Sequence, residues 1–110
     1  MIEILNIIKQ VTGLPIFPLS SDKKTEQVIY KPVPVGDNGI KKQYRIELNI
    51  VAKTLANVEH YDDAIRKALL NIGNTTKVKS VTNIELNGGG TLTSEVGVHR
   101  LLFLSVTEQV

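Results

Sequence analysis

Three consecutive glycines, Gly88, Gly89 and Gly90, are the first feature of this chain of 110 residues that could bind a ligand. A phosphate-binding loop needs a glycine-rich turn between a strand and a helix, followed by lysine and then serine or threonine. A dinucleotide loop likewise needs a helix N-terminus to hold the pyrophosphate. The residues after Gly90, "TLTSEVG", contain no lysine and lead into a strand-like segment. The run therefore predicts a mobile hairpin loop over residues 87–97 and not a phosphate site.

The other residues that could do chemistry are widely scattered. His60 and His99 lie far apart, and neither has a second histidine or a carboxylate at the spacing of a metal site. Without cysteine, neither a disulfide nor a thiolate metal site can form. Ser20 and Ser21 lack the pattern of a nucleophile elbow. We expect no catalytic residue, no metal and no cofactor.

Three carboxylates, Glu59, Asp62 and Asp63, cluster in the segment that we expect to form the second helix. Their spacing spreads them across the outer face of that helix, which indicates a solvated face. Asp62 precedes Arg66 by four residues and Asp63 precedes Lys67 by four. Such pairs stabilise a helix by a few tenths of a kcal/mol, roughly.

The composition indicates one globular domain over residues 1–110. Hydrophobic residues make up 42% of the chain and charged residues 22%, which is ordinary for a soluble domain of this length. The net charge of +2 is too balanced to indicate nucleic acid or an anionic membrane as the main partner. No apolar run reaches the roughly 20 residues that span a bilayer, so we expect no membrane contact.

Two helices are expected. Residues 2–12 carry apolar side chains around more than half of the helical wheel, so we expect more than one layer to cover them, including a neighbouring subunit. Gly13 and Pro15 end this helix. A second helix runs from about Val58 to Ile72, with Asn57 as its N-cap and Gly73 just after it. Leu70 falls outside its apolar stripe and is a candidate contact point.

Four strands are expected around these helices. Residues 43–53, "QYRIELNIVAK", alternate apolar and polar side chains, which predicts a strand with one buried and one solvent-exposed face. Residues 27–33 form a short strand that Pro32 ends or restricts to an edge, and residues 13–26 form a connecting segment. Residues 77–87 form a third strand. Residues 97–108 form a fourth, which is apolar on both faces and therefore central or sandwiched.

The resulting fold class is α+β, in the order helix, strand, strand, helix, strand, strand. The simplest packing is a mostly antiparallel four-stranded sheet with both helices on one face.

The apolar first helix, the segment "YRIELNIVAKTLANVEHYDDAIRKALL" and the closing segment "VTNIELNGGGTLTSEVGVHRLLFLSV" together resemble small tail-terminator (tail-completion) proteins of long-tailed bacteriophages and prophages. The resemblance covers most of the chain, above all from Tyr44 onward. It implies a protein without enzymatic activity that forms a ring, commonly a hexamer. The ring caps the tail tube, stops its polymerisation and presents a surface to the head connector.

The same resemblance implies assembly in the bacterial cytoplasm and a final place at the head-proximal end of the virion tail. The expected partners are further copies of the chain, the tail tube protein and the head connector or neck protein, while DNA only passes through the ring. Loops at residues 20–27, 33–41 and 87–97 would reach the tube or the connector. The interface candidates are Ile2, Leu5, Leu70, Arg45, Glu47, Asn49, Gly88, Gly89 and Gly90.

Three alternatives remain open from the sequence. Other head–tail connector and neck proteins are similar small α+β ring formers. A nucleic-acid-binding α+β module would need a basic sheet face, but the polar face of residues 43–53 mixes both signs of charge. A small enzyme would need a polar pocket that the sequence does not indicate.

Overall fold

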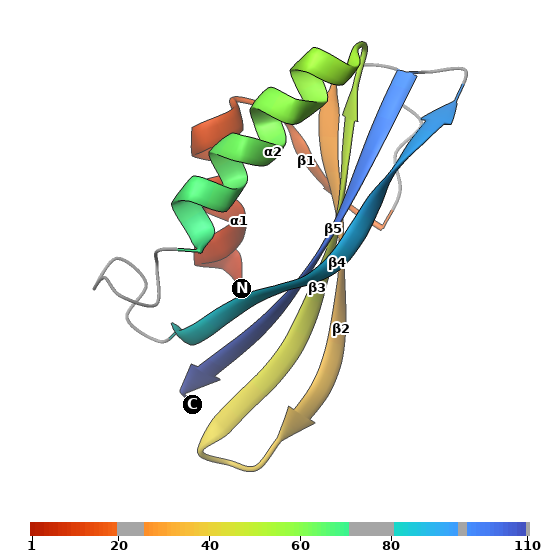
Figure 1. The fold of residues 1–110 in the computed structure, drawn as a ribbon. Helices are drawn as coiled ribbons and strands as arrows, with labels where there is room; N and C mark the ends of the chain where they lie inside the picture. The colour runs from red at the N-terminus through yellow and green to blue at the C-terminus, as the bar shows by residue number, and fades with distance from the viewer. Residues whose placement is uncertain (20–25, 71–80, 95–96, 110) are drawn as a thin grey trace.

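The computed structural model describes residues 1–19, 26–70, 81–94 and 97–109 (Figure 1). It is an α+β molecule in which two helices lie on one face of a single five-stranded mixed sheet, with strand order β1-β2-β3-β5-β4. No described helix is long and apolar enough to cross a bilayer. The elements are α1 (Ile2–Thr12), β1 (Ile16–Pro18), β2 (Gln27–Asp37), β3 (Lys41–Ala52), α2 (Leu55–Leu69), β4 (Val81–Ser94) and β5 (Gly97–Gln109).

The predicted four-stranded, mostly antiparallel sheet is wrong because the expected connecting segment contributes a fifth strand. β1 pairs with β2 in parallel, from Ile16 opposite Val28 to Pro18 opposite Tyr30. Pro15 directly before β1 and Pro18 at its end keep this segment extended. The Val28 N–H donates to the Pro15 carbonyl at 3.0 Å. A strand of three residues is too short to show an alternating pattern, so it could not be predicted from the sequence.

β2 is longer than predicted, because it continues through both prolines to Asp37. Backbone N–H groups along a strand point alternately to its two neighbours. The Val28 N–H points toward β1, so the backbone nitrogens of Pro32 and Pro34, four and six residues further on, also point away from β3. Neither proline therefore costs a bond to β3. The loop predicted at residues 33–41 shrinks to a short turn, in which the Asn38 side chain accepts the Lys41 N–H at 2.7 Å.

β3 and α2 form the centre of the core. The alternation predicted for β3 is confirmed, with its even-numbered residues from Tyr44 to Ala52 buried beneath the helices. α2 begins three residues earlier than predicted, because Thr54 and not Asn57 is the N-cap: the Thr54 hydroxyl accepts the Asn57 N–H at 3.1 Å. Ile72 and Gly73, the predicted end of this helix, lie outside the described residues.

α1 is only partly covered by its own chain. Ile4 and Ile8 are fully buried and Leu5 is half-buried, whereas Ile2 is 72% exposed. Figure 1 shows that α1 begins and α2 ends at the same end of the helical layer. Leu70, just after α2, is 41% exposed at that end, as its place outside the apolar stripe predicts.

The glycine run does not form a loop. β4 continues through it, with a β-bulge between Leu86 and Gly89, so the mobile hairpin loop predicted at residues 87–97 is wrong for residues 87–94. Residues 95 and 96 lie outside the described part of the chain. A Cβ on Gly89 would lie 2.0 Å from the Leu101 carbonyl oxygen, and its φ is +151°. β5 lies between β3 and β4, in agreement with the central position predicted from its two apolar faces.

Candidate functional site

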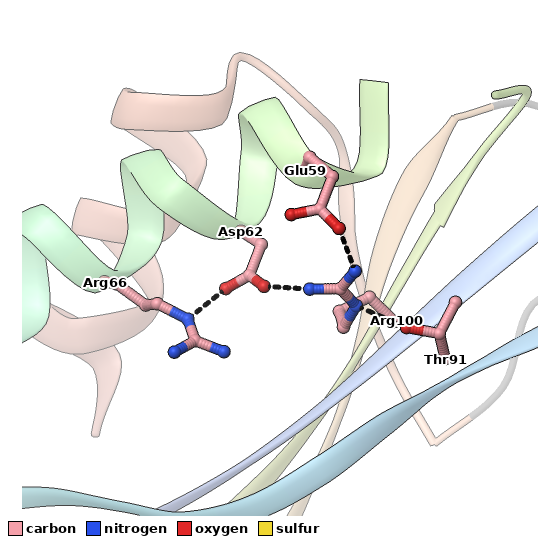
Figure 2. Close-up of polar contacts among 5 residues, drawn as sticks. All are labelled: Glu59, Asp62, Arg66, Thr91 and Arg100. Carbon is pink, nitrogen blue, oxygen red and sulfur yellow. Dashed lines mark hydrogen bonds and ion pairs between the residues drawn. The ribbon is translucent and has the colours of Figure 1, made fainter. Parts of the chain in front are cut away.

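A cluster of four charged side chains joins α2 to the sheet (Figure 2). Asp62, with only 4% of its side chain exposed, accepts a bond from Arg66 Nε at 2.6 Å and a second from Arg100 Nη1. Arg100 also pairs with Glu59, and its Nε donates to Thr91 Oγ1 at 2.8 Å. The cluster therefore connects α2, β5 and β4 through one buried carboxylate. We name these five residues, Glu59, Asp62, Arg66, Thr91 and Arg100, the Asp62 cluster.

The solvated face predicted for these carboxylates is wrong for Asp62. Asp62 follows Val58 by four residues and precedes Ile65 by three, so it lies on the buried stripe of α2. A carboxylate in such a stripe needs a cation that reaches in from another element, and the sequence could not show that Arg100 of β5 does so. The two expected helix pairs are confirmed, Asp62 with Arg66 at 2.6 Å and Asp63 with Lys67 at 2.9 Å.

The charges of the Asp62 cluster compensate one another. The hydrogen bond to Glu59 is the largest cause that raises the pKa of Arg100, with burial opposing it and Asp62 adding to it. Two cations and two carboxylates give a net charge of zero. We infer that the cluster fixes the orientation of α2 on the sheet.

A hollow of about 480 Å³ lies beside the cluster, between α2 and the glycine run of β4. Arg66, Thr91 and Arg100 form its polar rim, and the backbone of Gly88, Gly89 and Gly90 forms much of its wall. Figure 2 shows the two terminal nitrogens of Arg66 turned away from Asp62. The three predicted glycines thus lie together, but on a strand and next to a cationic group.

The predicted residues of β3 lie on the sheet face opposite the helices. Arg45 Nη2 lies 3.2 Å from Glu47 Oε2, and the buried Asn49 Oδ1 has no hydrogen-bond partner within the described ranges. Half-buried Leu101 and Phe103 of β5 stand opposite Asn49 and Glu47 on the same face. Glu47, Asn49, Leu101 and Phe103, together with residues of β2, line a shallow hollow of about 400 Å³. We name this side of the sheet the open face.

The remaining predicted interface residues lie elsewhere. Ile2 and Leu5 belong to α1, and Leu70 follows α2, so these three are on the helical side of the sheet. The nine predicted residues therefore form separate surfaces: the end of the helical layer, the open face and the glycine run.

The histidines lie apart from both hollows. His99 Nε2 is 2.7 Å from Ser94 Oγ at the end of the β4–β5 hairpin, and the His60 ring lies edge-on to Tyr61 with 5.7 Å between ring centroids. Among the residues that the structure describes, no three His, Cys, Asp or Glu side chains gather into a metal site.

No protein-family model matches the chain, and no curated protein sequence matches it.

Proposed function

We propose that this chain is a structural protein of phage assembly that forms a ring, a hexamer on the tail, and caps the tail tube at its head-proximal end. The sequence resemblance supports this function. The observation that carries it is the apolar surface that the chain leaves at least partly accessible on both sides of the sheet: exposed Ile2 and Leu70 on the helical side, and half-buried Leu101 and Phe103 on the open face. Uncovered apolar side chains that gather on a surface are typical of protein contacts.

A ring needs two different surfaces on each subunit, because each head-to-tail contact joins one patch to another. In our proposal the end of the helical layer, with Ile2 and Leu70, packs on the open face of the next copy. Leu101 and Phe103 would supply the apolar centre of that contact, and Arg45 and Glu47 its polar rim. The tube and the connector would then bind the two flat sides of the ring.

Leu70→Asp tests this proposal. Leu70 is exposed, so the variant keeps the fold, but it places a carboxylate in the apolar contact and should abolish capping of tail tubes. Ile65→Asp in α2 is the control, because Ile65 is buried and its replacement unfolds the domain. Circular dichroism and electron microscopy of tubes mixed with each variant give the two readouts.

The proposed contact is wrong if Leu70→Asp folds and still caps tubes. The orientation of α2 is wrong if Leu70→Asp unfolds the chain as fully as Ile65→Asp does. Binding of the wild-type ring to the head connector but not to tubes would instead indicate a neck protein.

A further inference from the structure

The outer edge of β4 is an open sheet edge. β4 is the last strand in the sheet order, and nothing in the described ranges pairs with the side that faces away from β5 (Figure 1). From Leu86 to Ser94 it carries no charged residue and no proline. Natural edge strands are commonly protected by such residues, because their unpaired N–H and C=O groups invite another strand.

The register shows which groups of β4 face outward. Antiparallel partners that exchange hydrogen bonds alternate with partners that do not. The Val28 N–H points to β1, so the next residue, Ile29, exchanges backbone hydrogen bonds with Asn49 on β3. Leu48, which is adjacent to Asn49, then points its backbone groups the other way and exchanges hydrogen bonds with Leu102 on β5. The odd-numbered residues of β5 therefore point their N–H groups toward β4.

After the bulge, Gly90 stands opposite Leu101 and Leu92 opposite His99. The backbone groups of Gly90 and Leu92 therefore form hydrogen bonds with β5. The backbone N–H and C=O groups of Thr91 and Thr93 consequently point away from the sheet. Thr91 and Thr93 thus offer two donors and two acceptors at the spacing that an added strand needs.

The opposite edge of the sheet is blocked in a matching way. β1 covers β2 only from Val28 to Tyr30. Beyond it, the two outward-facing positions are occupied by Pro32 and Pro34, which have no N–H. This part of β2 therefore offers no N–H donor to a β4 strand of another copy. Pairing of β4 with β4 of a second copy would close a two-fold dimer.

The charges beside the edge indicate a different occupant. The terminal nitrogens of Arg66 are turned away from Asp62 (Figure 2). Arg66 also lines the hollow beside the glycine run. The regular part of β4, from Gly89 to Ser94, has no carboxylate that a second copy could bring to Arg66. A peptide from another protein can supply one, and a carboxylate suits the fork of an arginine.

We propose that the β4 edge binds an extended peptide segment of another protein, which adds as a sixth strand and places an acidic side chain in the hollow against Arg66. Backbone bonds to Thr91 and Thr93 would give affinity, and Arg66 would select the acidic residue. This inference uses only the edge and the hollow, so it does not depend on the ring.

The test uses a blocked synthetic octapeptide of alternating threonine and valine with one central aspartate, and the same peptide with asparagine in that place. Both are titrated into ¹⁵N-labelled protein and followed by NMR. We expect saturable shifts of the Thr91 and Thr93 amides, with the aspartate peptide about tenfold tighter because its bond to Arg66 is charged. Arg66→Gln should make the two affinities equal. Arg66 is 44% exposed and Asp62 keeps its bond to Arg100, so this variant retains the fold.

The matched pair Thr93→Pro and Thr93→Val tests the backbone. Proline removes an outward N–H and should weaken binding about tenfold, whereas valine keeps the N–H and should change little. The proposal is overturned if the shifts are absent or lie on the open face. Equal binding by both Thr93 variants or an unchanged preference for aspartate in Arg66→Gln would also overturn it. So would a dimer that Thr93→Pro abolishes without any peptide, since the occupant would then be a second copy. If Thr93→Pro does not fold, Arg66→Gln decides alone.

Discussion

At the scale of single residues, Asp62 carries the most consequential contacts. It is a buried carboxylate that holds two arginines from two elements, so its removal leaves Arg100 largely buried with one partner fewer. We expect Asp62→Ala to lower the free energy of unfolding by about 3 kcal/mol. Its neighbour Asp63 provides the matched control: it is exposed and forms an ion pair with Lys67 one turn along the helix, so Asp63→Ala should cost less than about 0.5 kcal/mol. Urea denaturation measures both, and equal losses would mean that the Asp62 cluster does not hold α2.

Glu26 gives a prediction of pH dependence. One of its oxygens accepts the Lys53 N–H at 3.0 Å and Asn57 Nδ2 at 2.9 Å, and the other accepts the Tyr61 hydroxyl at 2.8 Å. The Lys53 N–H is the largest cause that lowers the pKa of Glu26 from its ordinary 4.5, and burial opposes it. The folded pKa is thus below the unfolded one. The stabilisation is therefore complete above the unfolded pKa and is lost as the pH falls through the folded pKa.

We accordingly expect Glu26→Gln to be less stable than the wild type by about 1 kcal/mol at neutral pH. The difference should shrink as the pH falls below 4.5, because protonation removes the same charge from the wild type. Urea denaturation across the pH range measures it, with Glu85→Gln on the exposed side of β4 as the control. A difference that stays constant down to low pH would show that the charge of Glu26 does not contribute.

At the scale of elements, the glycine run tests how β4 is built. A Cβ on Gly89 would collide with the Leu101 carbonyl oxygen, whereas a Cβ on Gly90 would meet nothing within 4 Å. Gly89→Ala should therefore destabilise the chain by about 2 kcal/mol or more, and Gly90→Ala by less than about 0.5 kcal/mol. Thermal unfolding of the two variants compares them directly. Similar melting temperatures would mean that residues 87–94 do form the loop that the sequence predicted.

The elements also show what the sequence could and could not predict. The alternation in β3 was readable because one of its faces is buried by helices and the other is not. Two features could not be predicted: the short strand Ile16–Pro18 and the continuation of β4 through Gly88–Gly90. The first depends on a parallel pairing and the second on a bulge, and both need partners distant in the sequence. The same holds for Asp62, which the sequence led us to place on a solvated face: its partner Arg100 lies on β5, far along the chain, and could not be predicted.

At the scale of the whole molecule, the apolar surfaces are divided between the two sides of the sheet. Exposed Ile2 and Leu70 lie on the helical side, and half-buried Leu101 and Phe103 lie on the open face. A C2 dimer buries the same patch on both copies, whereas a ring uses both patches of every copy. Of the interface residues expected from the sequence, Leu5 is half-buried in its own chain, whereas Ile2 and Leu70 remain exposed.

The most direct test of this account is to let tubes grow from the proposed partner, a phage tail tube protein, with and without this chain, and to measure their lengths by electron microscopy. We expect a single ring at one end of each tube and an early, constant length when the wild-type chain is present. Leu70→Asp should leave the tubes uncapped and growing. Wild-type protein that leaves tubes bare at both ends and equally long would contradict the proposed function.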